Sequence, residues 1–236
     1  MIRSEAKRLT LRYFPLAWSG IALAIVVLAP LTAMWGDVAS VLSVYGLSFD
    51  SFAMMLHELG LLVGLAITLR FLSRRGIGMS DLGLGTGIRA SWIAYAIGGF
   101  IIAIFLYPAV EAIVRAIGVG MFWWGDGRFK YLSALDWCLA VVAAVLMAPV
   151  IEEIFFRGYL LRAFLERTEN APAAICLSSL VFMSVHALMG PGILIYVFLW
   201  SLIPAYLYLR TGSLYPAMLM HALNNVFAYV VLPALL

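Results

Sequence analysis

Six polar side chains in the last hundred residues are of the types that hydrolytic chemistry uses. They are Glu152, Glu153, Arg157, His186, His221 and Asn225. A carboxylate beside an imidazole in a dry cavity can hold and deprotonate one water molecule, which is general-base catalysis. A second imidazole and an amide can donate hydrogen bonds to the oxyanion that forms when water attacks a carbonyl carbon. The residue types therefore favour hydrolysis by an activated water.

The spacing of these residues predicts which of them meet. Glu153 and Arg157 stand at i and i+4, so they share a helix face and can pair. Glu152 points about 100° away from Glu153 and is free to face another element. His221 and Asn225 also stand at i and i+4, so both can address the same small volume.

Each of these residues also has a purely structural interpretation. A Glu–Arg pair inside a membrane can brace two helices, a buried histidine is commonly a hydrogen-bonded core residue, and Asn225 can simply join two helices. The functional interpretation rests on all of them falling at one depth. Pro149, one turn before Glu152, lacks an amide proton and is expected to bend the helix there. No serine or cysteine stands beside a histidine at the spacing of a nucleophile, which disfavours covalent acyl transfer.

Composition identifies the kind of protein that positions these residues. Of the 236 residues, 65% are apolar and 11% are charged, against about 25% charged residues in soluble domains. The low charge excludes disorder, and a net charge of +3 spread along the chain gives no support for nucleic-acid binding. We therefore expect an all-α polytopic membrane protein, because lipid-facing backbone must satisfy its own hydrogen bonds.

Apolar runs long enough to cross a bilayer predict about seven transmembrane helices, or eight if one is split. Their predicted ranges are 16–35, 52–72, 91–117, 137–165, 173–189, 192–209 and 214–235. The longest predicted loops are 36–51, 73–90 and 118–136. Of the 15 Lys and Arg residues, eleven fall on the side of the N-terminus, three fall on the other side, and Arg157 lies within a span. The positive-inside rule then predicts a cytoplasmic N-terminus. The short chain with few long loops favours a bacterial inner membrane.

The second and third predicted spans also contain ionisable residues. His57 and Glu58 are expected near the outer interface, where solvation is cheap, and Glu111 lies late in its span. Their roles stay open. A proton-coupled transporter would use such residues, but the sequence lacks the repeated halves that many transporters have.

The three motifs Glu152-Glu153-x-x-x-Arg157, Phe182-x-x-x-His186 and His221-x-x-x-Asn225 resemble those of the CAAX protease and bacteriocin-processing (CPBP, or Abi) family, which includes the type II CAAX prenyl endopeptidases. The resemblance covers about residues 137–229, with a shorter likeness at Asp81–Leu84. It implies one membrane domain over 1–236, in which three N-terminal spans (1–136) precede a catalytic core (137–236) with a conical intramembrane cavity.

The resemblance also implies roles. Glu152 would activate water with help from His186, and His221 and Asn225 would form the oxyanion site. Glu153, Arg157 and Phe182 would support them. We expect an endopeptidase that needs no metal. The alternative is a zinc enzyme whose ligands are Glu152, His186 and His221, with one position left for water.

The expected partners are the bilayer and a peptide or membrane-protein substrate, with or without a lipid group. Some members of the family are linked to bacteriocin self-immunity or act as scaffolds, so a non-catalytic binding protein is the alternative function.

Overall fold

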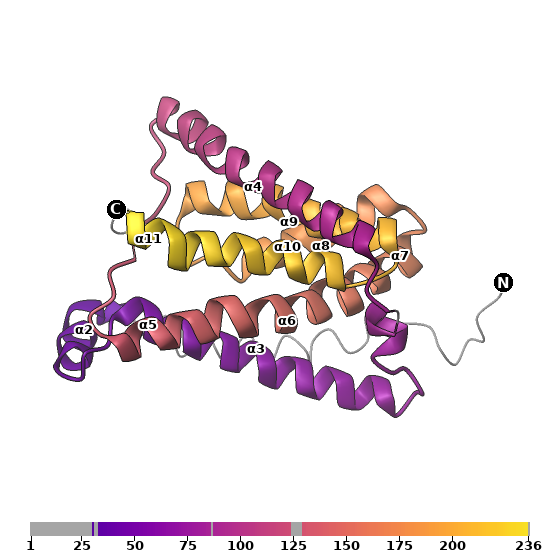
Figure 1. Cartoon of the computed structure of the whole chain (residues 1–236), viewed down its shortest axis with the longest axis horizontal. Coiled ribbons are helices and arrows are strands. Elements are labelled where there is room, and N and C mark those ends of the chain that lie inside the picture. The colour runs from indigo at the N-terminus through magenta and orange to yellow at the C-terminus, as the bar shows by residue number, and fades with distance from the viewer. Residues whose placement is uncertain (1–29, 31–32, 86, 124–128, 236) are drawn as a thin grey trace.

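Helices form the structured elements of the computed structural model, which describes residues 30, 33–85, 87–123 and 129–235 (Figure 1). In chain order they are α2 (Trp35–Val44), α3 (Phe49–Ser73), a π-helical turn (Ser80–Leu84), α4 (Ala90–Ala116), α5 (Ala134–Val141), α6 (Ala148–Glu152), α7 (Arg162–Thr168), α8 (Ala171–Ser184), α9 (Pro191–Thr211), α10 (Tyr215–Val226) and α11 (Leu232–Leu235). Three π-helical stretches, Val142–Met147, Glu153–Leu161 and Phe227–Val231, join α5 to α6, α6 to α7 and α10 to α11.

Five helices of the described residues are long and apolar enough to cross a membrane, which confirms an all-α membrane protein. They are Phe49–Ser73, Ala90–Ala116, Ala134–Thr168, Pro191–Thr211 and Tyr215–Leu235. Each begins and ends within a few residues of a predicted span. The predicted span at 16–35 falls almost entirely outside the described residues.

Two sequence-based expectations about the helices were wrong. The span predicted at 173–189 is the shorter helix α8, because the chain leaves the helix after Ser184 and turns. The loop predicted at 36–51 contains α2, whose ten residues are too few to cross a bilayer and give no span signal.

The long helix from α5 to α7 (Ala134–Thr168) contacts α3, α8, α9 and α10. α3 packs along α5 and α6, whereas α4, α9 and α10 pack against one another and α8 packs against α7 and α9 (Figure 1). As a result, every residue from 151 to 161 is buried, including Glu152, Glu153 and Arg157. A helix surrounded on all sides is expected to be apolar throughout, so three charged residues in this stretch need specific partners.

Pro149 lies in the first turn of α6, directly after a π-helical stretch. Proline cannot donate to the carbonyl one turn before it, and a wider helical turn is one way in which a helix accommodates that loss. The structure thus has a local change of helix type where the sequence predicted a bend. Such π-helical segments are frequent at functional sites.

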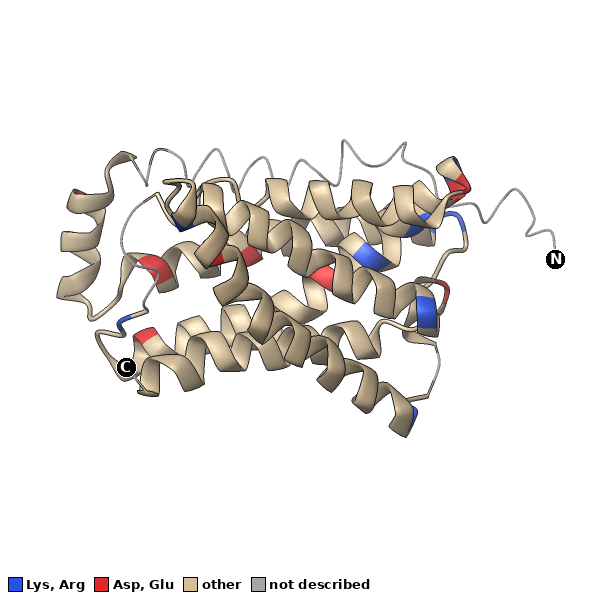
Figure 2. Ribbon diagram, turned by 90° about the horizontal axis from the view of Figure 1, so that it is seen from above, with Lys and Arg blue, Asp and Glu red and all other residues tan. Residues whose placement is uncertain are grey.

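Exposed arginines gather at one end of the bundle, where α3, α7 and α9 end and α4 begins (Figure 2). They are Arg70, Arg74, Arg75, Arg89, Arg167 and Arg210. Arg115 lies at the other end of α4 from Arg89, and Lys130 precedes the start of α5, at the other end of the long helix from Arg167. This distribution agrees with the positive-inside pattern, while the orientation in the membrane remains a prediction.

Hydrogen bonds to Asp136 connect the start of α3 with the start of α5. Its Oδ1 accepts hydrogen bonds from the backbone N–H and the hydroxyl of Ser48, both at 2.9 Å. Its Oδ2 accepts one from the N–H of Leu132 at 2.9 Å. The Asp136 side chain has no exposed surface, so these hydrogen bonds stabilise its charge in place of water. The contact sets the position of α3 beside the long helix.

Replacing Asp136 with Ala should therefore lower the free energy of unfolding by on the order of 2 kcal/mol, because three hydrogen bonds to a buried carboxylate are lost. Thermal unfolding of the detergent-purified protein measures this. Asp37→Ala removes an exposed aspartate of α2 and should leave the midpoint unchanged. Equal midpoints for the two variants would refute the anchoring role.

Candidate active site

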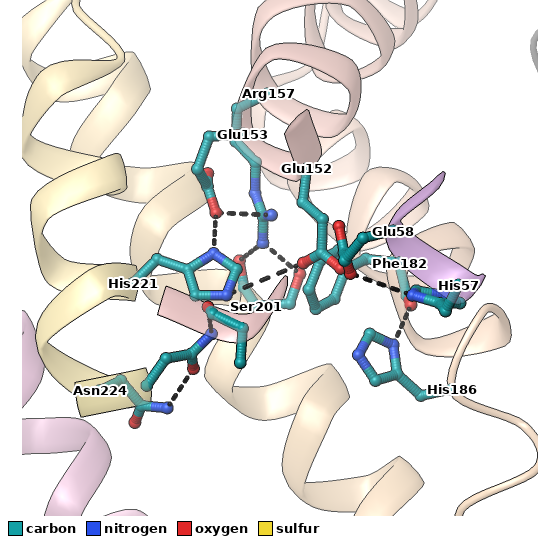
Figure 3. A network of polar contacts seen from close by, with 12 residues as sticks. His57, Glu58, Glu152, Glu153, Arg157, Phe182, His186, Ser201, His221 and Asn224 are labelled. Atoms are coloured by element: carbon teal, nitrogen blue, oxygen red, sulfur yellow. Dashed lines mark hydrogen bonds and ion pairs between the residues drawn. The ribbon is translucent and has the colours of Figure 1, made fainter. Parts of the chain in front are cut away.

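Arg157 is a fully buried cation that contacts several helices at once (Figure 3). Its Nη1 donates to Glu153 Oε1 at 3.0 Å, as the i, i+4 spacing predicts. Its Nη2 donates to the Oγ and the carbonyl oxygen of Ser201 on α9, at 2.8 and 3.2 Å. The guanidinium carbon lies 4.4 Å from the centre of the Phe182 ring on α8, which is a cation–π distance. Phe182 thus packs directly on the charged group.

Glu153 binds both Arg157 and His221. The same Oε1 lies 2.9 Å from His221 Nδ1, and because a carboxylate only accepts, Nδ1 donates. His221 Nε2 is then the nitrogen that faces Glu152, whose Oε2 lies 3.8 Å away. The edge of the ring packs on Trp200 at 4.7 Å between centres. One imidazole therefore lies between the two neighbouring glutamates.

Asn225 lies one turn after His221 on the same face of α10, as the spacing predicts. Its Nδ2 donates to the carbonyl oxygen of Ala144 at 2.7 Å, and its Oδ1 accepts from Asn224 at 3.3 Å. The carbonyl that it binds belongs to the π-helical stretch before Pro149. An amide has two N–H groups, so one remains for a ligand.

His186 lies just beyond the end of α8, in the turn that follows Ser184. Its Nδ1 donates to the carbonyl oxygen of Phe182 at 3.0 Å, and its ring packs on the Phe182 ring at 4.9 Å. Its Nε2 is therefore the nitrogen with a free lone pair. Among the described residues, no hydrogen bond or ion pair joins His186 directly to Glu152.

The expectation that His57 and Glu58 lie near the outer interface was wrong. Glu58 is 4% exposed, and its carboxylate faces Glu152 in Figure 3. His57, Glu58 and Glu152 each offer a ligand atom within 4.8 Å of the other two. Since α3 begins at Phe49, Glu58 lies nine residues into the helix, which is about 13 Å along the helix axis from its start. The signal available in the sequence was a carboxylate within an apolar span.

Glu111 lies away from this group. It pairs with Arg115 at 2.6 Å near the end of α4, and the arginine side chain is 73% exposed. The pair is thus a surface contact of the i, i+4 kind.

The potential metal ligands that the structure brings together are a set other than the predicted one. Two carboxylates and an imidazole form a common donor set, and His57, Glu58 and Glu152 supply it. The predicted zinc ligands Glu152, His186 and His221 do not form such a group within 4.8 Å among the described residues. Metal dependence itself stays a prediction to be tested.

The buried pair and the surface pair differ chiefly in burial, which gives a matched stability test. Arg157→Ala should cost about 3–5 kcal/mol, because it removes the arginine partner of the buried Glu153 carboxylate and leaves His221 as the remaining partner. Arg115→Ala removes the exposed partner of Glu111 and should cost at most about 1 kcal/mol. Chemical or thermal unfolding in detergent measures both. Similar losses for the two variants would contradict a central role for Arg157.

Comparison with known proteins supports the interpretation of the three motifs. The sequence profile of the family described as "Type II CAAX prenyl endopeptidase Rce1-like" matches residues 134–227. A protein of Bacillus subtilis (strain 168) named "Putative membrane peptidase YdiL" is 30% identical over 142 residues, which are 58% of this chain and 55% of that protein. This chain therefore spans about half the length of that relative. No solved structure shows a significant match. The predicted family resemblance is thereby confirmed for the part of the chain that holds the motifs.

Proposed function

We propose that this chain, whose residues 134–227 carry the sequence pattern of the type II CAAX prenyl endopeptidases, is an intramembrane endopeptidase. The observation that carries the proposal is the position of Glu152. It is a buried carboxylate with His221 Nε2 3.8 Å away and no Lys or Arg paired to it among the described residues. Such a carboxylate is available to hold and deprotonate a water molecule.

In the first step, water attacks the carbonyl carbon of the scissile peptide bond. Glu152 accepts the proton of the water as the C–O bond forms, and the carbonyl oxygen becomes an oxyanion. His221 Nε2 and the second N–H of Asn225 donate hydrogen bonds to this oxyanion. His186 Nε2, whose lone pair is free because Nδ1 binds Phe182, helps to orient or deprotonate the water.

Glu153 and Arg157 act by orientation. Glu153 on Nδ1 fixes the His221 ring and supports the positive charge that the ring carries while Nε2 donates. Arg157 holds the Glu153 carboxylate, and Phe182 covers the guanidinium. None of these three needs to touch the substrate.

The substrate class follows from the surroundings of the site. The reacting groups lie within a bundle of membrane-spanning helices, so the scissile bond belongs to a membrane protein or a membrane-associated peptide. An apolar groove of about 350 Å³ between α4, α6 and α10 is lined by Trp92, Pro149 and Tyr215, among others. Its lining residue Pro149 precedes Glu152 by about one helical turn, and the groove would accept an apolar side chain or a lipid group. We propose the bacterial inner membrane as the location, with the N-terminus in the cytoplasm.

The reaction as written requires no cofactor, and the zinc-dependent version of the same peptidase is the alternative. A zinc ion in the second version would supply the Lewis acid that polarises the carbonyl. The two versions differ in their response to a chelator.

The test is cleavage of a panel of fluorogenic peptides, some of them prenylated, by purified protein in detergent. Glu152→Ala and His186→Ala should each lower kcat about 10²–10⁴-fold, because each removes a group that acts on the water. Glu111→Ala is the matched control and should keep full activity. Activity should survive a strong zinc chelator.

Two outcomes would contradict this proposal in different ways. Loss of wild-type activity with chelator and recovery with zinc would establish the metal-dependent version. If the wild type and Glu152→Ala have equal activity, the non-catalytic binding function is favoured. The same holds if neither protein cleaves any peptide.

A further inference from the structure

We propose that Glu58 of α3 is a second catalytic carboxyl group, which protonates the amine that leaves the scissile bond, and that His57 positions it. The inference rests on the proposed function and assigns a step that the motif residues leave open. None of the three motifs includes a residue of α3.

The placement of Glu58 is specific. α3 packs against α6, and this contact brings the Glu58 carboxylate to the side of Glu152 opposite His221 (Figure 3). Ligand atoms of Glu58 and Glu152 lie within 4.8 Å of each other. A peptide bond attacked by water held at Glu152 would therefore have its nitrogen within reach of Glu58.

His57 and Glu58 of α3 each have one buried side-chain atom that lacks a hydrogen-bond partner. Glu58 Oε1 lies 3.1 Å from His57 Nδ1, which fixes the carboxyl group, but Glu58 Oε2 makes no hydrogen bond. His57 Nε2 makes none either, although the ring lies 6.1 Å from that of His186. Buried polar atoms without partners are costly, so each calls for an explanation such as a bound water, an ion or a catalytic role.

The local charges indicate which chemical role fits. Among the described residues, no Lys or Arg forms an ion pair with Glu58 or Glu152, and the nearby Arg157 binds Glu153 and Ser201. Two carboxylates within 4.8 Å of each other, with only the imidazoles of His57 and His221 beside them, repel each other unless one proton is held between them. The same arrangement supplies an acid and a base at one site, as paired carboxyl groups do in other hydrolases.

The step balances in protons and bonds. After attack, Glu152 carries the proton of the water and Glu58 carries the shared proton. As the C–N bond breaks, Glu58 gives its proton to the amine nitrogen, and the carbonyl re-forms as a carboxylic acid. Glu152 then passes its proton to Glu58, which restores the starting state without any other reactant.

The test compares two substrates that share the acyl part, a peptide amide and the corresponding nitrophenyl ester. The phenolate leaves without a proton, so an acid that serves the leaving group matters only for the amide. Glu58→Gln should lower kcat on the amide about 10²–10⁴-fold and change the ester rate less than threefold. Glu152→Gln should lower both rates. His57→Gln should reproduce the split between substrates to a smaller degree.

Controls separate this role from a structural one. Leu59→Ala changes an exposed neighbour on α3 and should leave both rates unchanged. Glu58→Asp keeps an acid and should retain more amide activity than Glu58→Gln at a similar unfolding midpoint.

Equal losses on amide and ester for Glu58→Gln, or no loss on the amide, would overturn the inference while the proposed function stands. Failure of the wild type to cleave either substrate would overturn the proposed function, and the inference with it.

Discussion

The buried guanidinium of Arg157 is the interaction on which the other polar contacts depend. A cation in the interior of a membrane bundle persists only if several groups share its charge. Glu153, Ser201 and the Phe182 ring do so, and they come from the long helix, α9 and α8. Ser201 in turn donates to Ser179 of α8 at 3.1 Å. The charge therefore fixes the relative positions of three helices at one depth.

Two neighbouring glutamates acquire different environments from this arrangement. Glu153 faces Arg157 and His221, so its charge is compensated and its geometry is set. Glu152 lies about 100° around the helix, beyond the reach of the arginine's hydrogen bonds, and meets His221 on one side and Glu58 on the other. One carboxylate is thus suited to orienting a ring and the other to moving protons, a division that environment alone can produce.

Helical spacing and hydropathy explain which parts of the fold and of the site the sequence could predict. The Glu153–Arg157 pair and the shared face of His221 and Asn225 follow from helical spacing, and hydropathy located the spans within a few residues. Glu58 was missed because hydropathy gives depth along a span but not its rotation about the axis, which packing sets. The direction of Glu58 depends on α3 lying against α6, a contact between segments about ninety residues apart.

The proposed mechanism depends on direct attack by water at a peptide carbonyl beside Glu152. The most direct test is mass spectrometry of the wild-type protein, quenched in acid while it cleaves a peptide in oxygen-18 water. Direct attack by water predicts oxygen-18 in the new carboxyl group of the product and an unmodified mass for the intact protein throughout turnover. A protein mass increased by the acyl fragment of the substrate would reveal a covalent acyl-enzyme and contradict direct attack by water.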